Sequence, residues 1–248
     1  MRTFATIAAI VGLSLAGTAA IAQTEVPVAI AAAVADAARP EPDKARDAAR
    51  KPAEIVAFAG VKPGDKVAEF LPGGGYYTRI LAKAVGPEGH VYVLVPAGFA
   101  QRLGGLDALN ALAAQYGNVT VVATDLTNFT LPEPVDLAWT TENYHDMHNG
   151  PTPSFAGVNE STFRALKPGG IYFVEDHSAA PGAGTSVTST LHRIEPAVVI
   201  EEVSSVGFAL DAQSDLLANP DDPKTAGVRD PSVQGETEKF ALRFRKSG

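Results

Sequence analysis

The sequence predicts an α/β fold, namely a doubly wound, mostly parallel sheet of seven strands with an antiparallel strand at its C-terminal end. Three observations predict it. Short β-branched runs alternate with helical segments along most of the chain, a glycine-rich turn follows the first of these runs, and the last run is reached through a long polar loop. Because strand–helix–strand crossovers are right-handed, this alternation places helices on both faces of one sheet.

The first elements lead into the sheet. Residues 23–51 are expected to form a helical lead-in, rich in Ala at first and polar from 44 to 50. Pro52 suits the first turn of a new helix, and Gly60 lies where a helix commonly ends. Residues 52–248 are then predicted to form one domain.

Strands and helices alternate after Gly60, beginning with a buried strand at 66–70. Further strands are expected at 90–95, 119–123, 135–140 and 171–175, with helices at 76–84, 103–116 and 155–166.

The end of the chain departs from this alternation. A helix is expected at 195–206 and a strand from 207 to 210. Near the C-terminus Phe240, Leu242 and Phe244 alternate with basic residues, which is the period of a half-buried strand. A late strand reached through a long loop fits an antiparallel pair at the edge of the sheet.

Residues 1–22 have the pattern of a cleavable signal peptide. Arg2 provides a basic start, residues 4–20 are apolar and uncharged, and Ala20-Ile21-Ala22 matches a cleavage site before Gln23. A transmembrane anchor is the alternative, but the apolar run is short and rich in Ala and Gly. We therefore expect a periplasmic or secreted protein without membrane attachment after cleavage.

Net charge and the lack of cysteine exclude several classes of function and of site. The formal net charge of −8 argues against a general nucleic-acid binder, which needs a basic surface to neutralise phosphates. The chain has no cysteine, which excludes disulfides, thiolate zinc sites and cysteine nucleophiles. The oligomeric state does not follow from the sequence.

The most informative segment is the turn Pro72-Gly73-Gly74-Gly75, which lies between the strand at 66–70 and a helix. Glycines there let a ligand approach the backbone, and the helix start presents free N–H groups. A P-loop is excluded because no Gly-Lys-Ser/Thr follows. A dinucleotide turn fits poorly, because Thr78 stands where its third glycine belongs. The third class is the nucleoside sulfonium site of methyltransferases.

The segment from Glu69 to Gly75 resembles the first motif of class I S-adenosylmethionine (SAM)-dependent methyltransferases, an acid followed by a glycine-rich turn. The bridge at 85–91 and Leu166-Lys167-Pro168-Gly169-Gly170 are similar to that family as well. In detail the chain resembles a group of predicted exported bacterial methyltransferases, through the segments 72–78, 142–146, 175–177 and 190–193. The resemblance implies a Rossmann-like methyltransferase fold and SAM as cofactor.

The resemblance also implies roles for single residues. Glu69 matches the acid that orients the amino-acid end of SAM, and Gly73, Gly74 and Gly75 line its methionine part. The remaining cofactor residues follow later strands and are Asp125 at the adenine, Leu126 against its ring and Glu142. Asp125 also suits a plain turn, since Asp-Leu-Thr-Asn is a common turn sequence.

Two positions depart from the family pattern. Leu71 stands in place of the usual first glycine, and Val95 stands where an acid normally holds the ribose hydroxyls. The loss of that carboxylate removes about 1–3 kcal/mol of hydrogen bonding to the ligand.

Polar residues follow two strands whose carboxyl ends meet on the side of the glycine turn. We expect His145 and His177 to be candidate bases, with Asp146 or Asp176 orienting them. Methyl transfer itself mainly requires donor and acceptor to be held in line. Ordinary loop histidines and acids are the alternative interpretation.

No metal site is predicted. His145, His148, Asp146, Asp176 and His177 are suitable ligand types, but their spacing matches no strong metal motif. A hydrolytic triad is weaker still, because no G-x-S-x-G elbow is present.

The leading hypothesis is SAM-dependent methyl transfer to a small-molecule acceptor. The alternative is an exported, non-catalytic ligand-binding domain of the same fold with an altered cofactor site. We also predict that Gly75→Arg abolishes SAM binding and leaves the fold intact.

Overall fold

The computed structural model describes residues 25–98, 106–149 and 154–247. The predicted signal peptide at 1–22 lies outside these residues and stays a prediction. Within the described residues, no helix is long and apolar enough to cross a membrane.

One seven-stranded sheet runs through the molecule in the order β3-β2-β1-β4-β5-β7-β6. All pairings are parallel except those of β7, which is antiparallel to both β5 and β6. The predicted fold class is therefore confirmed. The strands are β1 (Lys66–Phe70), β2 (His90–Pro96), β3 (Val119–Thr124), β4 (Val135–Thr141), β5 (Leu166–His177), β6 (Phe208–Ser214) and β7 (Lys239–Lys246).

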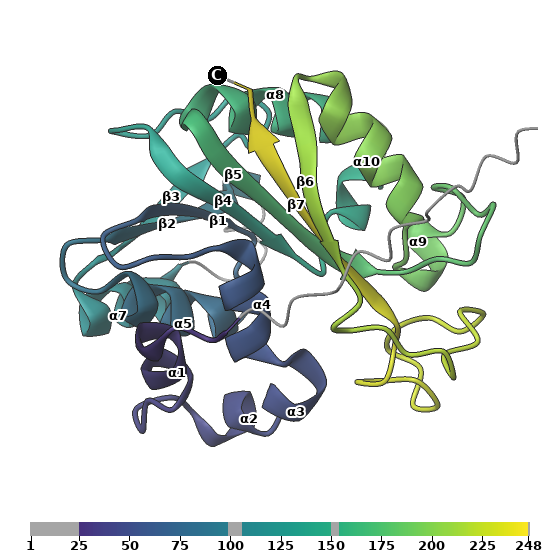
Figure 1. Ribbon diagram of the computed structural model, residues 1–248, viewed down its shortest axis with the longest axis horizontal. Helices are drawn as coiled ribbons and strands as arrows, with labels where there is room; N and C mark the ends of the chain where they lie inside the picture. Colours follow the sequence, from purple (N-terminus) through teal and green to yellow (C-terminus); the bar gives the residue numbers. More distant parts are fainter. Residues whose placement is uncertain (1–24, 99–105, 150–153, 248) are drawn as a thin grey trace, which may run out of the picture.

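Helices cover both faces of this sheet (Figure 1). One face carries α1 (Val28–Val34), α4 (Pro52–Ala59), α5 (Tyr76–Val85) and α7 (Asp107–Tyr116). The other face carries α8 (Phe155–Ala165) and α10 (Pro196–Ser205). The short helices α2 (Glu41–Lys44), α3 (Asp47–Arg50) and α9 (Thr188–Leu191), and a 3-10 turn η1 (His145–His148), lie around the ends of the strands.

Each face has its own apolar core. Trp139 and Phe173 pack against Tyr77 and Phe58 on the α5 side. On the α8 side the core contains Tyr172 and Phe244, among others. Since adjacent strand residues point to opposite faces, the apolar runs in β4 and β5 feed both cores at once.

Strand β5 begins earlier than predicted. The sequence predicts a helix that ends at Leu166 and a strand that starts at Ile171. In the structure Leu166 already pairs with Val135, and the register shifts before Ile171 pairs with Leu137. Gly169, at φ 72°, accommodates the irregularity, because left-handed backbone is easy only for glycine.

The lead-in residues pack onto the sheet domain. The carboxylate of Asp47 accepts hydrogen bonds from Arg39 and from the Tyr76 hydroxyl at 2.6 Å each, and Asp43 pairs with Arg79 at 3.0 Å. These contacts hold residues 25–51 beside the first turn of α5.

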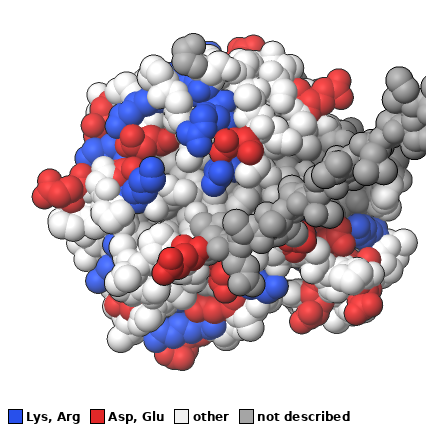
Figure 2. Space-filling view, viewed as in Figure 1, with Lys and Arg blue, Asp and Glu red and all other residues white. Residues whose placement is uncertain are grey.

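Figure 2 shows acidic and basic side chains interspersed over the face that it presents.

Candidate active site

A pocket of about 530 Å³ opens where β4 and β5 end and β7 begins. Side chains from α3, from the segment after β4, from His192 beyond α9 and from the loop before β7 line it. The lining residues are Arg46, Ala49, Arg50, Glu142, His145, Asp146, His177, His192, Val228, Arg229, Gln234, Gly235, Thr237 and Lys239. Parallel strands therefore deliver their polar ends to one place, as expected for an open α/β sheet.

A buried Asp–His pair forms one wall. His145 Nδ1 lies 2.8 Å from one oxygen of Asp176, which is fully buried. Asp176 also accepts the backbone N–H groups of His145 and His177 at 2.7 Å each. Because the carboxylate only accepts hydrogen bonds, His145 Nδ1 donates, and its Nε2 faces the pocket in the neutral ring. Burial alone would lower the pKa of His145, but the facing Asp176 raises it above its ordinary value.

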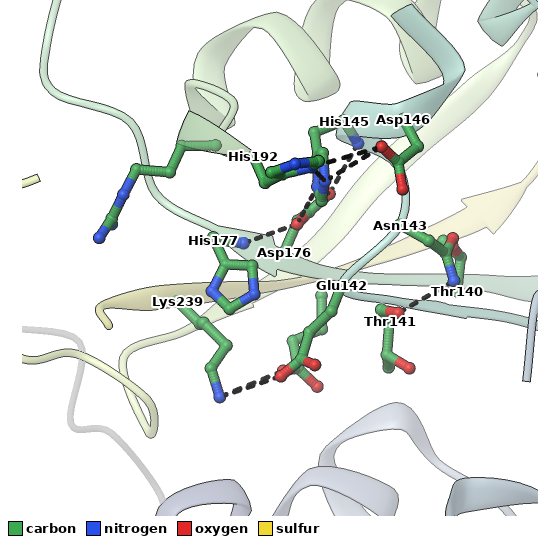
Figure 3. Close-up of polar contacts among 12 residues, drawn as sticks. Thr140, Thr141, Glu142, Asn143, His145, Asp146, Asp176, His177, His192 and Lys239 are labelled. Atoms are coloured by element: carbon green, nitrogen blue, oxygen red, sulfur yellow. Dashed lines mark hydrogen bonds and ion pairs between the residues drawn. The ribbon is translucent and has the colours of Figure 1, made fainter. Parts of the chain in front are cut away.

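Two more polar side chains lie close to His145 Nε2. His192 Nδ1 lies 3.2 Å from it, and Asp146 Oδ1 lies 3.4 Å from it. Figure 3 shows these three side chains converging from η1 and from the end of α9. His192 has a left-handed backbone at φ 56°, a conformation that non-glycine residues adopt infrequently.

His177 belongs to the same pocket but differs from His145 in its pKa and in its hydrogen-bond partner. Burial lowers its pKa to about 4, and its Nδ1 contacts the Thr237 hydroxyl at 2.9 Å. The ring is therefore neutral at pH 7 and a weak base. Of the two histidines predicted as bases, only His145 has a carboxylate hydrogen-bonded to its ring.

An ion cluster forms the opposite wall. Glu142 pairs with Arg50 and, at 3.3 Å, with Lys239. Burial would raise the pKa of Glu142, but these two cations lower it to about 2. Glu142 has a left-handed backbone at φ 54°, and its N–H donates to the carbonyl of Glu175 at 2.9 Å. Its conformation is thus maintained by contacts from three segments far apart in the chain.

The glycine turn lies beside this pocket. Arg50 lies over the rings of Tyr76 and Tyr77, the first residues of α5, at 4.8 and 5.8 Å. Asn143, just after β4, donates from Nδ2 to the carbonyl of Phe70 at the end of β1, at 3.1 Å. The glycine turn and the pocket are therefore neighbours along the rim of the sheet formed by the carboxyl ends of the strands.

The three glycines of the turn are not equivalent. A Cβ atom at Gly73 or Gly74 would meet nothing within 4 Å, so the backbone there faces open space. A Cβ at Gly75 would lie 2.4 Å from Leu112 Cδ1, and Gly75 has φ 81°. Gly75→Arg is therefore expected to cost stability, because the Leu112 side chain would have to move and the left-handed backbone would be strained.

Glu69 lies beneath this turn. Its carboxylate accepts a hydrogen bond from the Thr78 hydroxyl at 2.6 Å, and the residue is 2% exposed. Burial raises the pKa of Glu69 to about 7. The residue therefore connects the strand to the first turn of α5.

The predicted adenine residues lie farther along the rim. Asp125 follows β3 directly and is exposed, and its Oδ1 accepts the N–H and hydroxyl of Thr127. This is the turn arrangement that the sequence left open as an alternative. Leu126 is buried at 8% exposure, and Val95 is buried at the end of β2, where it offers no hydrogen bond to a ribose.

The structure thus brings together Glu142, His145, Asp146 and His177 but not every candidate. His148 points elsewhere: its Nε2 lies 3.2 Å from Glu202, and its ring stacks on Phe155. Sequence reasoning missed Arg50, Lys239 and His192 as site residues. The segment 190–193 is part of the family resemblance, but only the fold shows that His192 meets His145.

Comparison with solved structures identifies the fold. The chain matches a SAM-dependent methyltransferase from Aquifex aeolicus with a TM-score of 0.56 and 18% identity, covering 83% of this chain and 93% of that one. The N-methyltransferase NodS from Bradyrhizobium japonicum has a TM-score of 0.54 and 13% identity, covering 84% of this chain and 98% of that one. The [4+2]-cyclase SpnF has a TM-score of 0.58 and 15% identity, covering 83% of this chain and 80% of that one. The protein has the fold of class I SAM-dependent methyltransferases.

A sequence relative adds a shorter match. Over 75 residues the chain is 43% identical to a protein-L-isoaspartate O-methyltransferase of Ignicoccus hospitalis, which is 29% of this chain and 33% of that enzyme. The chain thus spans about a third of that relative. No family model matches the sequence.

Proposed function

We propose that the protein is an enzyme that transfers a methyl group from SAM to a small molecule. The observation that carries this proposal is the pairing of two neighbouring features. A glycine turn with open space above Gly73 and Gly74 adjoins a polar pocket in which His145 faces the cavity. The methyltransferase fold and the partial match to an O-methyltransferase support it.

The cofactor fits the turn in part. A Cβ at Gly74 would project into open space, so the glycines leave the backbone accessible to a ligand. Glu69, Gly73, Gly74, Gly75, Asp125, Leu126 and Glu142 are the residues that would hold SAM. When bound, SAM supplies an electrophilic methyl carbon.

His145 would receive the acceptor's proton. Asp176 accepts from Nδ1 and fixes the ring, so that Nε2 carries the lone pair on the pocket side, where His192 Nδ1 lies 3.2 Å away and would have to give way to the acceptor. General-base assistance of this kind is typically worth about 10²–10⁴-fold in rate. Asp176 is a positioning residue in this mechanism, since it acts through His145.

We expect an acceptor that carries negative charge, because the basic side chains that line the pocket outnumber the acids: they are Arg46, Arg50, Arg229 and Lys239, against Glu142 and Asp146. Glu142 already pairs with Arg50 and Lys239, and Asp43 pairs with Arg46, so the anion would have to share these cations with their present partners. We expect a small molecule whose methylated atom is an oxygen, because the partial sequence match is to an O-methyltransferase. An anionic group would be held by the basic side chains beside the methylated atom.

Calorimetric titration of the full chain with SAM tests the proposal. A dissociation constant below about 100 μM supports it, and one weaker than about 1 mM contradicts it. Transfer of a labelled methyl group to candidate carboxylates and hydroxyl compounds then identifies the acceptor.

Two observations favour a second candidate, a binding domain with an altered cofactor site. Leu71 takes the place of the first glycine and has a left-handed backbone at φ 51°, and buried Val95 offers no ribose ligand. The [4+2]-cyclase among the similar structures is a named case of this fold in other chemistry. Failure of SAM to bind, with retained binding of another small molecule, would establish it.

Export belongs to the same proposal. The pattern of residues 1–22 supports cleavage before Gln23 and a periplasmic or secreted location. The mass of the protein recovered from a bacterial host tests it, because cleavage removes 22 residues and leaves Gln23 at the N-terminus.

A further inference from the structure

We propose that His145, Asp146 and His192 bind one divalent transition-metal ion, of the zinc type, in the wall of the pocket. Among the described residues these three side chains bring ligand atoms within 4.8 Å of one another. Two imidazole nitrogens and one carboxylate oxygen are a ligand set that zinc uses in catalytic sites, with a fourth position open.

The distances favour a tetrahedral ion. His145 Nε2, His192 Nδ1 and Asp146 Oδ1 form a triangle with sides of 3.2, 3.4 and 3.6 Å. Ligands bonded to a tetrahedral zinc at ~2.0–2.1 Å lie about 3.3–3.4 Å apart. Neighbouring ligands of an octahedral ion at the same bond length lie about 2.8–3.0 Å apart, as for magnesium. A hydrogen bond between the two rings would explain only the 3.2 Å side.

The surroundings are those of a metal ligand. Zinc-bound histidines commonly donate their second ring nitrogen to a carboxylate, which fixes the ring and its tautomer. His145 does so to Asp176, itself held by two backbone N–H groups. The left-handed backbone of His192 is a second indication, because strained conformations gather at functional sites.

An ion at this position would face the cavity. All three ligand residues line the pocket, and Asp146 is 48% exposed, so an ion can enter from solvent. The role of the ion rests on the proposed methyl transfer. A hydroxyl acceptor at the open position would lose its proton to solvent more readily, because a bound divalent ion lowers the pKa of an oxygen ligand. The oxygen–methyl bond would then form as the sulfur–methyl bond breaks. In the metal-bound protein the ion would thus replace His145 in the role of base proposed above, and His145 would act as a ligand.

Titration with Co²⁺ tests the site without reference to activity. The full chain, purified without a histidine tag and treated with a chelator, should bind one Co²⁺ per chain with a dissociation constant below about 10 μM. The visible spectrum should be the intense one of tetrahedral cobalt, and Zn²⁺ should displace the cobalt.

Variants assign the ligands. His192→Asn should weaken binding at least ~10-fold, and Asn suits the left-handed backbone at this position. Asp176→Asn should weaken it about 10–100-fold by releasing His145. His90→Asn is the matched control and should leave metal binding unchanged, because His90 lies at the start of β2, away from the carboxyl ends of the parallel strands where the pocket lies. If His192→Asn does not fold, Asp146→Asn provides the same test at an exposed side chain.

Three outcomes would overturn the inference. They are no saturable binding at about 1 mM Co²⁺, an octahedral spectrum, or binding that His192→Asn and Asp146→Asn leave unchanged. A separate SAM titration distinguishes the two proposals. Metal binding without SAM binding would support the metal site and contradict the proposed methyl transfer. SAM binding by a chain that binds no metal would support the methyl transfer and contradict the metal site.

Discussion

The glycine turn and the polar pocket adjoin each other at the rim of the sheet but are built in different ways. The turn is one continuous segment, from Glu69 to Tyr77, and it presents backbone to open space. The pocket gathers charged side chains and histidines from α3, η1, β5, the end of α9 and the loop before β7. A contiguous segment can be found in the sequence by its pattern, whereas a pocket made from distant segments exists only once the chain has folded.

Their acids show the same contrast. Burial raises the pKa of Glu69, beneath the turn, to about 7, and the hydrogen bond from the Thr78 hydroxyl opposes this rise only in part. The cations Arg50 and Lys239 lower the pKa of Glu142, in the pocket, to about 2 against the effect of its burial. The two regions therefore differ in whether charge is avoided or balanced.

Asp176→Asn should have the largest effect and act on the pocket alone. Asn cannot accept all the N–H groups that Asp176 accepts, so His145 loses its fixed orientation. We expect methyl transfer to slow by about 10³-fold while the SAM dissociation constant changes less than about threefold. Single-turnover kinetics and calorimetry measure the two quantities. An equal loss in both would mean that the regions are not separate.

Gly74→Leu should act on the turn alone. The side chain would enter open space, at a backbone conformation without strain, so the fold should be retained. If SAM lies over the turn, its affinity should fall about 100-fold. Gly74→Ala is the matched small substitution and should lose much less. Calorimetry checks the affinity and circular dichroism the fold; unchanged affinity in Gly74→Leu would move the cofactor elsewhere.

Glu69→Gln should make the protein more stable at high pH. The folded pKa is raised above the unfolded value, so the carboxyl's contribution is fully present below pH 4.5 and is lost as pH rises to about 7. Gln keeps an oxygen for Thr78 and has no charge to bury. We expect a gain of about 2–3 kcal/mol at pH 8 and little difference at pH 4.5, measured by urea unfolding. A gain independent of pH would contradict the assignment.

Glu142→Gln should have the opposite pH dependence and the smallest effect. The folded pKa lies below the unfolded value, so the carboxylate stabilises fully above pH 4.5, and this contribution is lost as pH falls toward 2. Because Glu142 is only 22% exposed, Arg50 and Lys239 would lose a partner with little solvent to replace it. We expect a loss of about 1–3 kcal/mol at pH 7 that shrinks below pH 4, again by urea unfolding.

Residue patterns were sufficient for most of the fold. The strand at Lys66–Phe70 and the helix start at Tyr76 follow from local signals, since β-branched and apolar runs and glycine turns act over a few residues. The start of β5 was missed because Leu166 joins the sheet only through its pairing with Val135. The candidates His145 and His177 follow from the rule that parallel strands end on one side of a sheet, whereas only the fold shifts their pKa values apart, upward for His145 beside Asp176 and downward for buried His177.

The sequence by itself determined the sheet, its glycine turn and the strand ends from which polar side chains emerge, because these depend on neighbours along the chain. Only the tertiary structure decided that Arg50 and Lys239 meet at Glu142 and that His192 meets His145. Residues 50 and 142 are 92 positions apart, and residues 145 and 192 are 47 apart. No local pattern encodes such contacts, since they arise when the two cores on either face of the sheet bring these segments together.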